Sequence, residues 1–277
     1  MGKWIRRTVM AVLLAVFLFS AGSILVIMNQ YRISDQLYDD IASQYTHERE
    51  AGEKQETGGR EEQTGENGPA AERAPITVDF EGLLAANDEV VGWIYCEDTP
   101  INYPVVRGED NDYYLRHSYD GKGSAAGSIF VEAANQAGFA DSNTIIYGHH
   151  MKNGSMFAGL DKWADQEYYE EHPVMWLLTP EQDFKVLLFS GYTTSAASDT
   201  YTIFTGPAEE IDDYLRKSVS QSDFQANVVL YREARYVLLS TCAYVFDNAR
   251  YVLHGVLVPV DSAGGAPLPE GKTKAPR

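Results

Sequence analysis

The chain has 277 residues, a formal net charge of −18 and only two cysteines. This length accommodates one or two domains, and the acidic balance argues against nucleic acid as a partner because the sequence offers no basic patch to neutralise phosphates. The acidity is typical of a soluble extracellular domain, and it can also attract a cationic amine at long range.

An almost unbroken apolar run occupies residues 9–28 near the N-terminus. Some twenty helical residues span about 30 Å, the thickness of a bilayer core. Lys3, Arg6 and Arg7 precede the run, which favours a cytoplasmic N-terminus and an extracellular remainder. A cleaved signal peptide is the alternative, although its apolar core is usually only about 7–15 residues long. We therefore favour a cytoplasmic tip and a single-pass membrane anchor over residues 1–28.

Residues 29–75 are expected to connect this anchor to a folded domain. Apolar residues recur at near-helical spacing between Asn29 and Tyr45, which predicts a helical stalk. From His47 to Pro75 the sequence is rich in Glu, Gly, Gln, Lys and Arg. Such a segment buries too little apolar surface to offset the entropy lost on ordering. We expect it to be a flexible tether that holds the domain away from the membrane.

Residues 76–260 are expected to form one domain that is mainly β with helical insertions. A short helix opens it, with Asp79 as its N-cap and its end near Asn87. Eight short apolar segments follow, and they predict a closed barrel or a sandwich. These segments are residues 92–96, 101–106, 128–131, 144–147, 174–178, 185–192, 235–241 and 251–258.

Two helical insertions are predicted between the strands. One covers residues 155–172 and is stopped by Pro173. The other covers residues 207–219 and has Pro207 at an early helical position. The tail, residues 261–277, is rich in Gly and Pro and is expected to be disordered. Apolar residues spaced by four define one face of the second helix: Ile211, Leu215 and Val219.

Three chemically reactive side chains fall at the ends of the predicted strands. Cys242 follows one strand, Arg250 precedes the next, and His149 follows Tyr147 and Gly148 far upstream. The short connection between Cys242 and Arg250 brings both to one rim of the sheet. A thiol nucleophile, a titratable imidazole and a fixed cation are the minimum set for acyl transfer through a thioester.

This arrangement resembles the sortases, the cysteine transpeptidases of Gram-positive cell surfaces. Their signature is Thr-Leu-x-Thr-Cys with a downstream Arg and an upstream His. Leu239-Ser240-Thr241-Cys242 fits it, whereas Leu238 stands where the family usually has Thr. The resemblance is to class B and implies a closed eight-stranded barrel, an N-terminal helix and a helix before the nucleophile strand. It extends in the same order through residues 79–84, 91–94, 101–106, 110–115, 127–130 and 147–151.

The resemblance assigns a role to each reactive side chain. Cys242 would be the nucleophile, and since an isolated thiol has a pKa of about 8.5, a nearby cation is needed to form the thiolate. His149 would act as general acid toward the leaving amine. Arg250 would stabilise the oxyanion and align the substrate backbone. An ordinary ion pair with Asp247 or a Glu is the competing interpretation of the arginine.

The neighbouring His150 complicates the assignment of the acid. Adjacent strand residues face opposite sides, and the pattern alone does not say which side is inner. The family has its histidine directly after Gly, which selects His149. Four further residues match class B positions that bind the sorting peptide or shape the site, with packing as the competing role: Asn111, Tyr147, Ser240 and Thr241.

Both cysteines are expected to be free thiols. Two cysteines in an exported protein invite a disulfide interpretation, but a bridge would remove the nucleophile Cys242. Cys96 lies in an apolar strand, where a free cysteine is common as a small hydrophobe. The sequence contains neither His-Glu-x-x-His nor Cys-x-x-Cys, so neither a metal nor another cofactor is expected.

The leading interpretation is a membrane-anchored class B sortase with an extracellular catalytic domain. It would cleave a sorting motif of secreted proteins after Thr and pass the acyl fragment from Cys242 to an amine of a peptidoglycan precursor or to a pilin lysine. The alternatives are another cysteine acyl-transferase or wall peptidase, and an inactive surface-binding module. L,D-transpeptidases carry Arg two residues after the Cys, where Tyr244 stands here, and papain-type peptidases place Cys before His.

Overall fold

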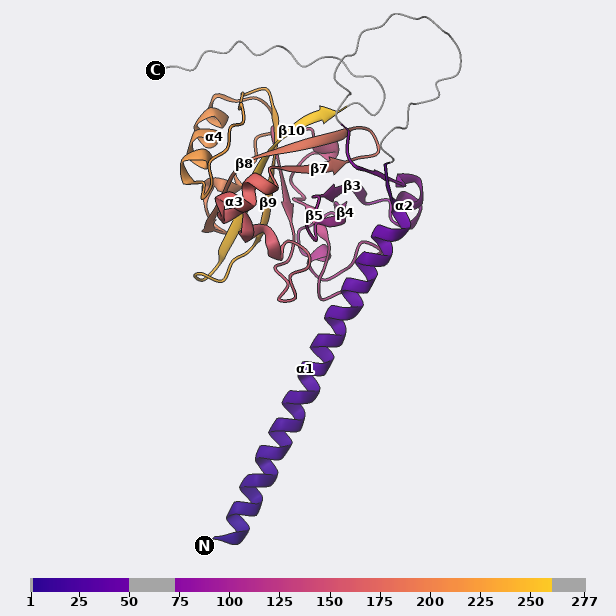
Figure 1. The fold of residues 1–277 in the computed structure, drawn as a ribbon, viewed down its shortest axis with the longest axis vertical. Helices are drawn as coiled ribbons and strands as arrows, with labels where there is room; N and C mark the ends of the chain where they lie inside the picture. Colours follow the sequence, from indigo (N-terminus) through magenta and orange to yellow (C-terminus); the bar gives the residue numbers. More distant parts are fainter. Residues whose placement is uncertain (1, 50–72, 261–277) are drawn as a thin grey trace, which may run out of the picture.

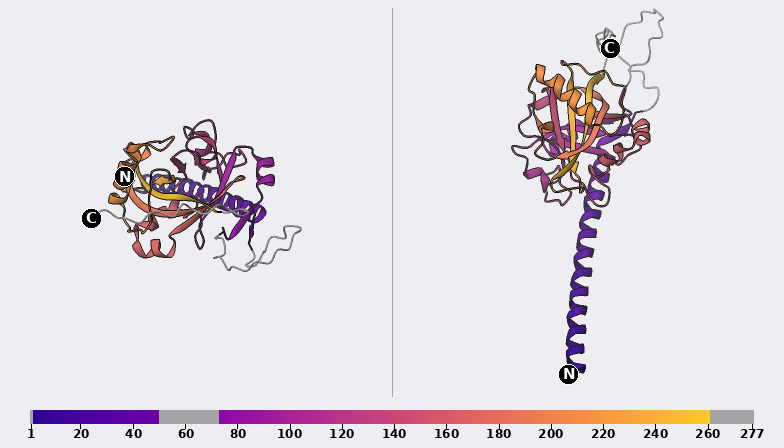
Figure 2. Two further views of the ribbon diagram at one scale, coloured as in Figure 1. Left: turned by 90° about the horizontal axis from the view of Figure 1, so that it is seen from above. Right: turned by 90° about the vertical axis from the view of Figure 1, so that its left-hand side faces the viewer.

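The computed structural model describes residues 2–49 and 73–260. It begins with one helix, α1 (Lys3–Tyr45), which extends from the domain as a long rod (Figure 1). The part Trp4–Tyr45 is long and apolar enough to cross a membrane, and none of its most apolar stretch is buried. The right-hand view of Figure 2 also shows the N-terminal part of α1 extending away from the domain. The expected anchor and the expected stalk are therefore one continuous helix.

The C-terminal part of α1 contributes to the core of the domain. Tyr38, Ile41 and Tyr45 are at most 7 % exposed and join the main apolar cluster. The Tyr38 hydroxyl donates to the carbonyl oxygen of Gly127. Its ring meets the Tyr103 ring edge-on, with the ring centres 5.4 Å apart. The sequence predicts that the domain starts at residue 76, but its core also includes these residues of α1.

The expected tether differs from the structure at both of its ends. Strand β1 (Thr46–Glu48) pairs antiparallel with β2 (Ile76–Val78), and Arg49 N–H donates to the Pro75 carbonyl at 2.8 Å. Residues 50–72 lie outside the described residues, as does the predicted tail from residue 261. Because the two ends are paired on the domain, this segment does not set the distance between α1 and the barrel. Because β1 consists of Thr, His and Glu, it has no apolar pattern that would predict a strand.

The eight predicted strands are all present and close into a barrel. The strand order is β10-β8-β7-β3-β4-β5-β6-β9. The β4–β5 and β6–β9 pairs are parallel and the others antiparallel. The strands are β3 (Val90–Tyr95), β4 (Asn102–Val106), β5 (Ile129–Val131), β6 (Asn143–Tyr147), β7 (Val174–Leu178), β8 (Asp183–Ser195), β9 (Arg235–Cys242) and β10 (Ala249–Val260).

Short helices lie between the strands, mostly where the sequence predicts them. Helix α2 (Phe80–Ala86) is capped by the Asp79 carboxylate, which accepts from Gly82 N–H at 3.0 Å. The first insertion is a 3₁₀ helix, η3 (Ala158–Ala164), followed by α3 (Gln166–Glu171). The remaining 3₁₀ turns are η1 (Tyr113–Leu115), η2 (Ala137–Phe139) and η4 (Asp199–Tyr201).

Helix α4 (Glu209–Gln221) precedes the nucleophile strand, as expected, but two predicted details are wrong. Pro207 lies outside the helix, because the N-cap is Ala208. Val219 is 47 % exposed, whereas Ser218 is buried. At about 100° per residue, a position eight residues after Ile211 has turned about 80° away from its face, while position i+7 has returned to it.

Truncation of the chain at Ile76 is expected to destabilise the domain. A fragment 76–260 lacks Tyr38, Ile41 and Tyr45, and burial of each large apolar side chain contributes about 1.5–3 kcal/mol. We expect the fragment 29–260 to be more stable by at least about 5 kcal/mol, a large part of a typical domain stability. Urea unfolding of the two fragments measures this difference. Equal midpoints would show that α1 is not part of the folding unit.

His254 on β10 is buried between the barrel and α4. Its Nε2 lies 3.1 Å from the Tyr214 hydroxyl and 3.5 Å from the Ser218 hydroxyl. Its ring also packs against Phe189 and Tyr192. Burial of the imidazole lowers the pKa of His254 from 6.5 to about 3. The residue is therefore neutral in the folded protein at physiological pH.

The buried His254 predicts a loss of stability in mild acid. Below pH 6.5 the unfolded state binds a proton that the folded state does not bind until about pH 3, so acidification favours unfolding within this window. His254→Gln removes this titration. Between pH 7 and pH 5 the free energy of unfolding of the wild type should fall by about 2 kcal/mol more than that of the variant. Parallel urea titrations at both pH values test this, and an equal fall would contradict the burial argument.

Candidate active site

Cys242 and Arg250 face each other on adjacent strands. Cys242 ends β9, Arg250 is the second residue of β10, and the two are register partners. Cys242 is a half-buried free thiol. Arg250 Nη1 donates to the Ala249 carbonyl at 3.0 Å. Within residues 2–49 and 73–260 no ion pair joins Arg250 to Asp247 or to any other carboxylate, which leaves the guanidinium charge beside the thiol.

His149 reaches the same rim because β6 runs parallel to β9. Tyr147 is the register partner of Ser240, and Gly148 N–H donates to the Ser240 carbonyl at 3.1 Å. His149 Nε2 lies 2.8 Å from the Leu115 carbonyl oxygen. A carbonyl only accepts, so Nε2 carries the proton in this contact and Nδ1 is the nitrogen left free for proton transfer.

Gly148 has a steric reason to be glycine. A Cβ at this position would lie 2.5 Å from Ile129 Cδ1 and 2.6 Å from Phe157 Cδ2, well inside van der Waals contact. Any larger residue would displace the backbone that leads into His149. The Gly-His pair of the sequence therefore reflects close packing directly before His149.

One cavity of about 280 Å³ brings the predicted site residues together. All seven residues singled out from the sequence line it, so the structure leaves none of them elsewhere. His150 is absent from the described lining; its ring packs edge-on against Tyr244 with the centres 5.3 Å apart. The lining residues are Asn111, Asp112, Leu115, Phe130, Tyr147, Gly148, His149, Ser240, Thr241, Cys242 and Arg250.

Glu132 anchors this cavity and was missed by the sequence analysis. Its carboxylate accepts from Asn111 Nδ2 at 2.6 Å and from the Tyr147 hydroxyl at 2.9 Å. Asn111 Oδ1 in turn accepts from Ala133 N–H at 2.8 Å. Burial and the nearby Glu132 carboxylate raise the pKa of Tyr147, which keeps the phenol protonated. A single Glu after a strand is too common in sequences to signal such a role.

Tyr201 in η4 packs behind the wall of this cavity, against Ser240 and Tyr147. Its hydroxyl lies 2.8 Å from Ser240 Oγ, and its ring stacks on Tyr147 with the centres 6.4 Å apart. Burial raises the pKa of Tyr201. The Thr241 hydroxyl is buried and has no hydrogen-bond partner in the described part of the chain. Ser240 is thus engaged in the wall, while Thr241 holds a free polar atom.

The second cysteine lies away from this rim. Cys96 is 1 % exposed, and its thiol lies 3.5 Å from the Val174 carbonyl oxygen. Burial raises the pKa of Cys96 to about 12, so this thiol stays protonated and unreactive at neutral pH. Both cysteines are free, as predicted. No group of three or more His, Cys, Asp and Glu suited to a metal ion is found among the residues described.

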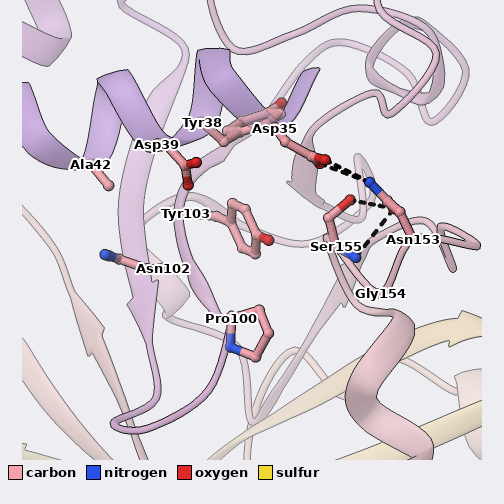
Figure 3. A pocket seen from close by; sticks show the side chains of 10 residues that line it. All are labelled: Asp35, Tyr38, Asp39, Ala42, Pro100, Asn102, Tyr103, Asn153, Gly154 and Ser155. Carbon is pink, nitrogen blue, oxygen red and sulfur yellow. Dashed lines mark hydrogen bonds between the residues drawn. The ribbon is translucent and has the colours of Figure 1, made fainter. Parts of the chain in front are cut away.

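The loop that follows His149 is attached to α1 (Figure 3). Asn153 Nδ2 donates to both carboxylate oxygens of Asp35, at 2.9 and 2.8 Å, and Asn153 Oδ1 accepts from the Ser155 hydroxyl at 2.9 Å. These residues border a second cavity of about 340 Å³ between α1 and the barrel. Phe157 N–H closes the loop onto the His149 carbonyl at 3.0 Å. Helix α1 therefore meets the domain at the end that carries the site.

Comparison with known proteins gives the same fold. A family model described as the Sortase domain matches residues 94–258, more than half of the chain. The chain is similar to Sortase B of Listeria monocytogenes, with 34 % identity over 260 residues that cover 92 % of this chain and 98 % of that protein. The chain belongs to the class B sortases. It is therefore a cysteine transpeptidase.

Further relatives of this sortase support the same conclusion. Sortase B of Staphylococcus aureus is 32 % identical over 192 residues, which cover 67 % of this chain and 77 % of the relative. The crystal structure of sortase B from B. anthracis in complex with AAEK1 gives a TM-score of 0.67 at 30 % identity, over 84 % of this chain and 99 % of that one. A Staphylococcus aureus sortase B–substrate complex gives a TM-score of 0.62 at 28 % identity, over 66 % and 85 %. The barrel and the resemblance inferred from the sequence are confirmed.

The two adjacent histidines provide a direct test of the expected acid. His149→Ala should lower kcat/KM by at least about 10²-fold, because proton transfer to the leaving amine is lost. His150→Ala should lower it by less than about fivefold, since His150 contacts Tyr244 at the edge of the site. Steady-state kinetics on a sorting peptide measures both variants. Equal losses would leave the acid unassigned between the two imidazoles.

Proposed function

We propose that this sortase cleaves sorting signals of secreted proteins after a Thr residue and transfers the acyl fragment to an amine through a thioester on Cys242. The convergence of Cys242, His149 and Arg250 on one cavity carries the proposal. A Staphylococcus aureus sortase B with similar structure has been solved as a substrate complex, which supports a sorting-signal peptide as the partner.

The first half-reaction forms the thioester. The Cys242 thiolate attacks the Thr carbonyl carbon, the Sγ–C bond forms, and the peptide C–N bond breaks. The leaving amine takes a proton from His149 Nδ1, since Nε2 is engaged with the Leu115 carbonyl. The Arg250 guanidinium, beside Cys242 in the register, donates to the oxyanion of the tetrahedral intermediate.

The second half-reaction returns the enzyme to its starting state. An acceptor amine attacks the thioester carbonyl, loses a proton to His149 and forms a new amide. The C–Sγ bond breaks, and Cys242 is released as thiolate. The acceptor is an amine of a peptidoglycan precursor or a pilin lysine, whose positive charge the acidic chain attracts at long range.

The sorting peptide would occupy the cavity wall opposite the thiol. Asn111 and Tyr147 are held in place by Glu132, so their remaining hydrogen-bonding capacity is presented in a fixed orientation. Thr241, whose hydroxyl is buried and without a partner in the described chain, would shape the site through its backbone. The class B resemblance implies a motif similar to Asn-Pro-x-Thr-Asn, with Pro second and Thr fourth.

We propose further that α1 anchors this sortase in the cell membrane as a single span. The helix is long and apolar enough to cross a bilayer. Basic residues precede the apolar run, which favours a cytoplasmic N-terminus. The catalytic domain would then lie on the extracellular side, where surface proteins are attached to the cell wall.

Product masses from a small peptide library test the proposed reaction. The full chain in detergent is incubated with peptides of the Asn-Pro-x-Thr-Asn type and a short amine acceptor, with and without chelator. We expect cleavage between the fourth and fifth residues, a ligated product and no effect of the chelator. Cys242→Ala is the matched control. Cleavage at another bond, or loss of activity with chelator, would indicate a peptidase of another kind.

A further inference from the structure

We propose that the turn between β9 and β10, residues 243–248, inserts its apolar tip into the surface of the lipid bilayer. The catalytic cavity would then open directly at the membrane. This inference rests on the proposed anchoring by α1 and goes beyond the proposed reaction.

The tip of this turn is an exposed apolar run. Tyr244 and Val245 are each 73 % exposed, and Phe246 is 51 % exposed. In the described part of the domain after α1, no other large apolar side chains of this exposure are consecutive. Contiguous exposed apolar surface of this kind marks an interaction site. Tyr and Phe are also the aromatic side chains that collect at the water–lipid boundary.

The base of the turn is firmly hydrogen-bonded, so the tip projects from a fixed support. Ala243 N–H donates to the Ala249 carbonyl at 2.9 Å, and Ala249 N–H donates to the Phe246 carbonyl at 3.1 Å. Ala196 N–H donates to the Asn248 carbonyl at 3.0 Å. Asn248 takes the positive φ of 60° that reverses the chain. This support fixes the backbone from which the exposed side chains project.

Contacts place the turn at the end of the domain that α1 enters. The Tyr244 hydroxyl lies 3.5 Å from the His150 carbonyl, and their rings are in edge-on contact. The loop that begins at His150 continues to Asn153, which binds Asp35 on α1. Figure 1 shows the β9–β10 connection, coloured gold, at the end of the domain from which α1 extends.

The length of α1 keeps this end close to a bilayer. The apolar run ends at Met28, and Asp35 follows seven residues later. At 1.5 Å per residue this separation is about 10 Å along the helix axis. Because α1 continues without a break to Tyr45, the domain has no flexible joint that would carry the turn away from the surface.

The charge around the tip favours partition into the apolar layer over attraction to charged lipids. The turn itself carries only the exposed Asp247, and the whole chain has a net charge of −18. Anionic lipid headgroups would repel this surface, so a neutral bilayer should serve as well as a charged one. An amine acceptor carried on a lipid would reach Cys242 without leaving the membrane surface.

Photocrosslinking of the full chain in phosphatidylcholine nanodiscs tests the inference. The photoreactive residue p-benzoylphenylalanine replaces Val245, or Val229 as a matched control, in a Cys242→Ala background that makes labelling independent of catalysis. Val229 is 80 % exposed but lies before β9, whose eight residues separate it from the turn by about 26 Å. Replacement of Leu25 in α1 reports the anchor itself. Phospholipid adducts are counted by mass spectrometry.

We expect adducts at positions 25 and 245 and at least about tenfold fewer at position 229, with no loss in high salt. Adding Phe246→Ser should reduce the yield at position 245 severalfold. If lipid adducts form at position 25 but the yield at position 245 is no higher than the yield at position 229, the inference is overturned and the proposed function stays intact. A crosslink from 245 to a second copy of the chain would overturn it in favour of a dimer interface. Absence of lipid at position 25 would overturn the anchoring and this inference together.

Discussion

Cys242→Ala is expected to reduce transpeptidation by at least about 10⁴-fold, because the substitution removes the sulfur atom that forms the thioester with the acyl fragment. The free energy of unfolding should change by less than about 1 kcal/mol, since the side chain is half-buried at the end of β9 and alanine removes one atom. Activity on a sorting peptide and urea unfolding measure the two effects separately.

Cys96→Ala is expected to have the opposite effect, with lower stability and unchanged activity. This thiol is fully buried, and its replacement should lower the free energy of unfolding by about 1 kcal/mol through a small cavity while kcat/KM stays within about twofold. Burial raises the pKa of Cys96 to about 12, so it offers no thiolate at neutral pH. An inactive Cys96 variant beside an active Cys242 variant would overturn the assignment of the nucleophile.

Arg250→Lys is expected to lower kcat/KM by about 10²–10³-fold although the positive charge is kept. The guanidinium donates several N–H groups in a fixed planar fork, whereas an ammonium is a point charge on a flexible stem. In this structure one arm of the fork is already braced on the Ala249 carbonyl, which orients the rest beside Cys242. Steady-state kinetics on a sorting peptide gives the change in kcat and KM.

Arg235→Lys is the matched control for this substitution. Arg235 lies at the other end of β9, donates to the Phe139 carbonyl at 3.2 Å and sits over the Phe184 ring at 4.9 Å. Its replacement should lower stability slightly and leave kcat/KM unchanged. If Arg250→Lys kept activity within about threefold, charge alone would suffice, and the oxyanion role would be wrong.

The strands and the reactive side chains were predictable because their signals are local. Apolar segments bounded by polar turns located all eight strands, and they placed Cys242 at the end of one strand and Arg250 at the start of the next, where the structure pairs the two residues. His149 required the family resemblance, since nothing in the sequence alone indicates that β6 and β9 are parallel neighbours. Long-range pairing of this kind depends on closure of the barrel and not on the residues of one segment.

The contributions of α1 and of Glu132 were not predictable for a related reason. In the sequence, Tyr38, Ile41 and Tyr45 form an ordinary apolar stripe on a helix. Only the structure shows that this stripe packs into the main apolar cluster of the domain. The role of Glu132 is evident only from the structure, in which Asn111 and Tyr147 each donate a hydrogen bond to one of its two carboxylate oxygens. Side chains that act by holding others carry no motif of their own.

Mass spectrometry of the acyl-enzyme tests the central claim most directly. The full chain is incubated with a sorting peptide without an amine acceptor, quenched in acid and digested. We predict the acyl fragment, ending in Thr, on Cys242, with release by hydroxylamine as expected for a thioester and no adduct in Cys242→Ala. An acyl fragment on any other residue, or cleaved peptide without a thioester at any time of quenching, would contradict the mechanism.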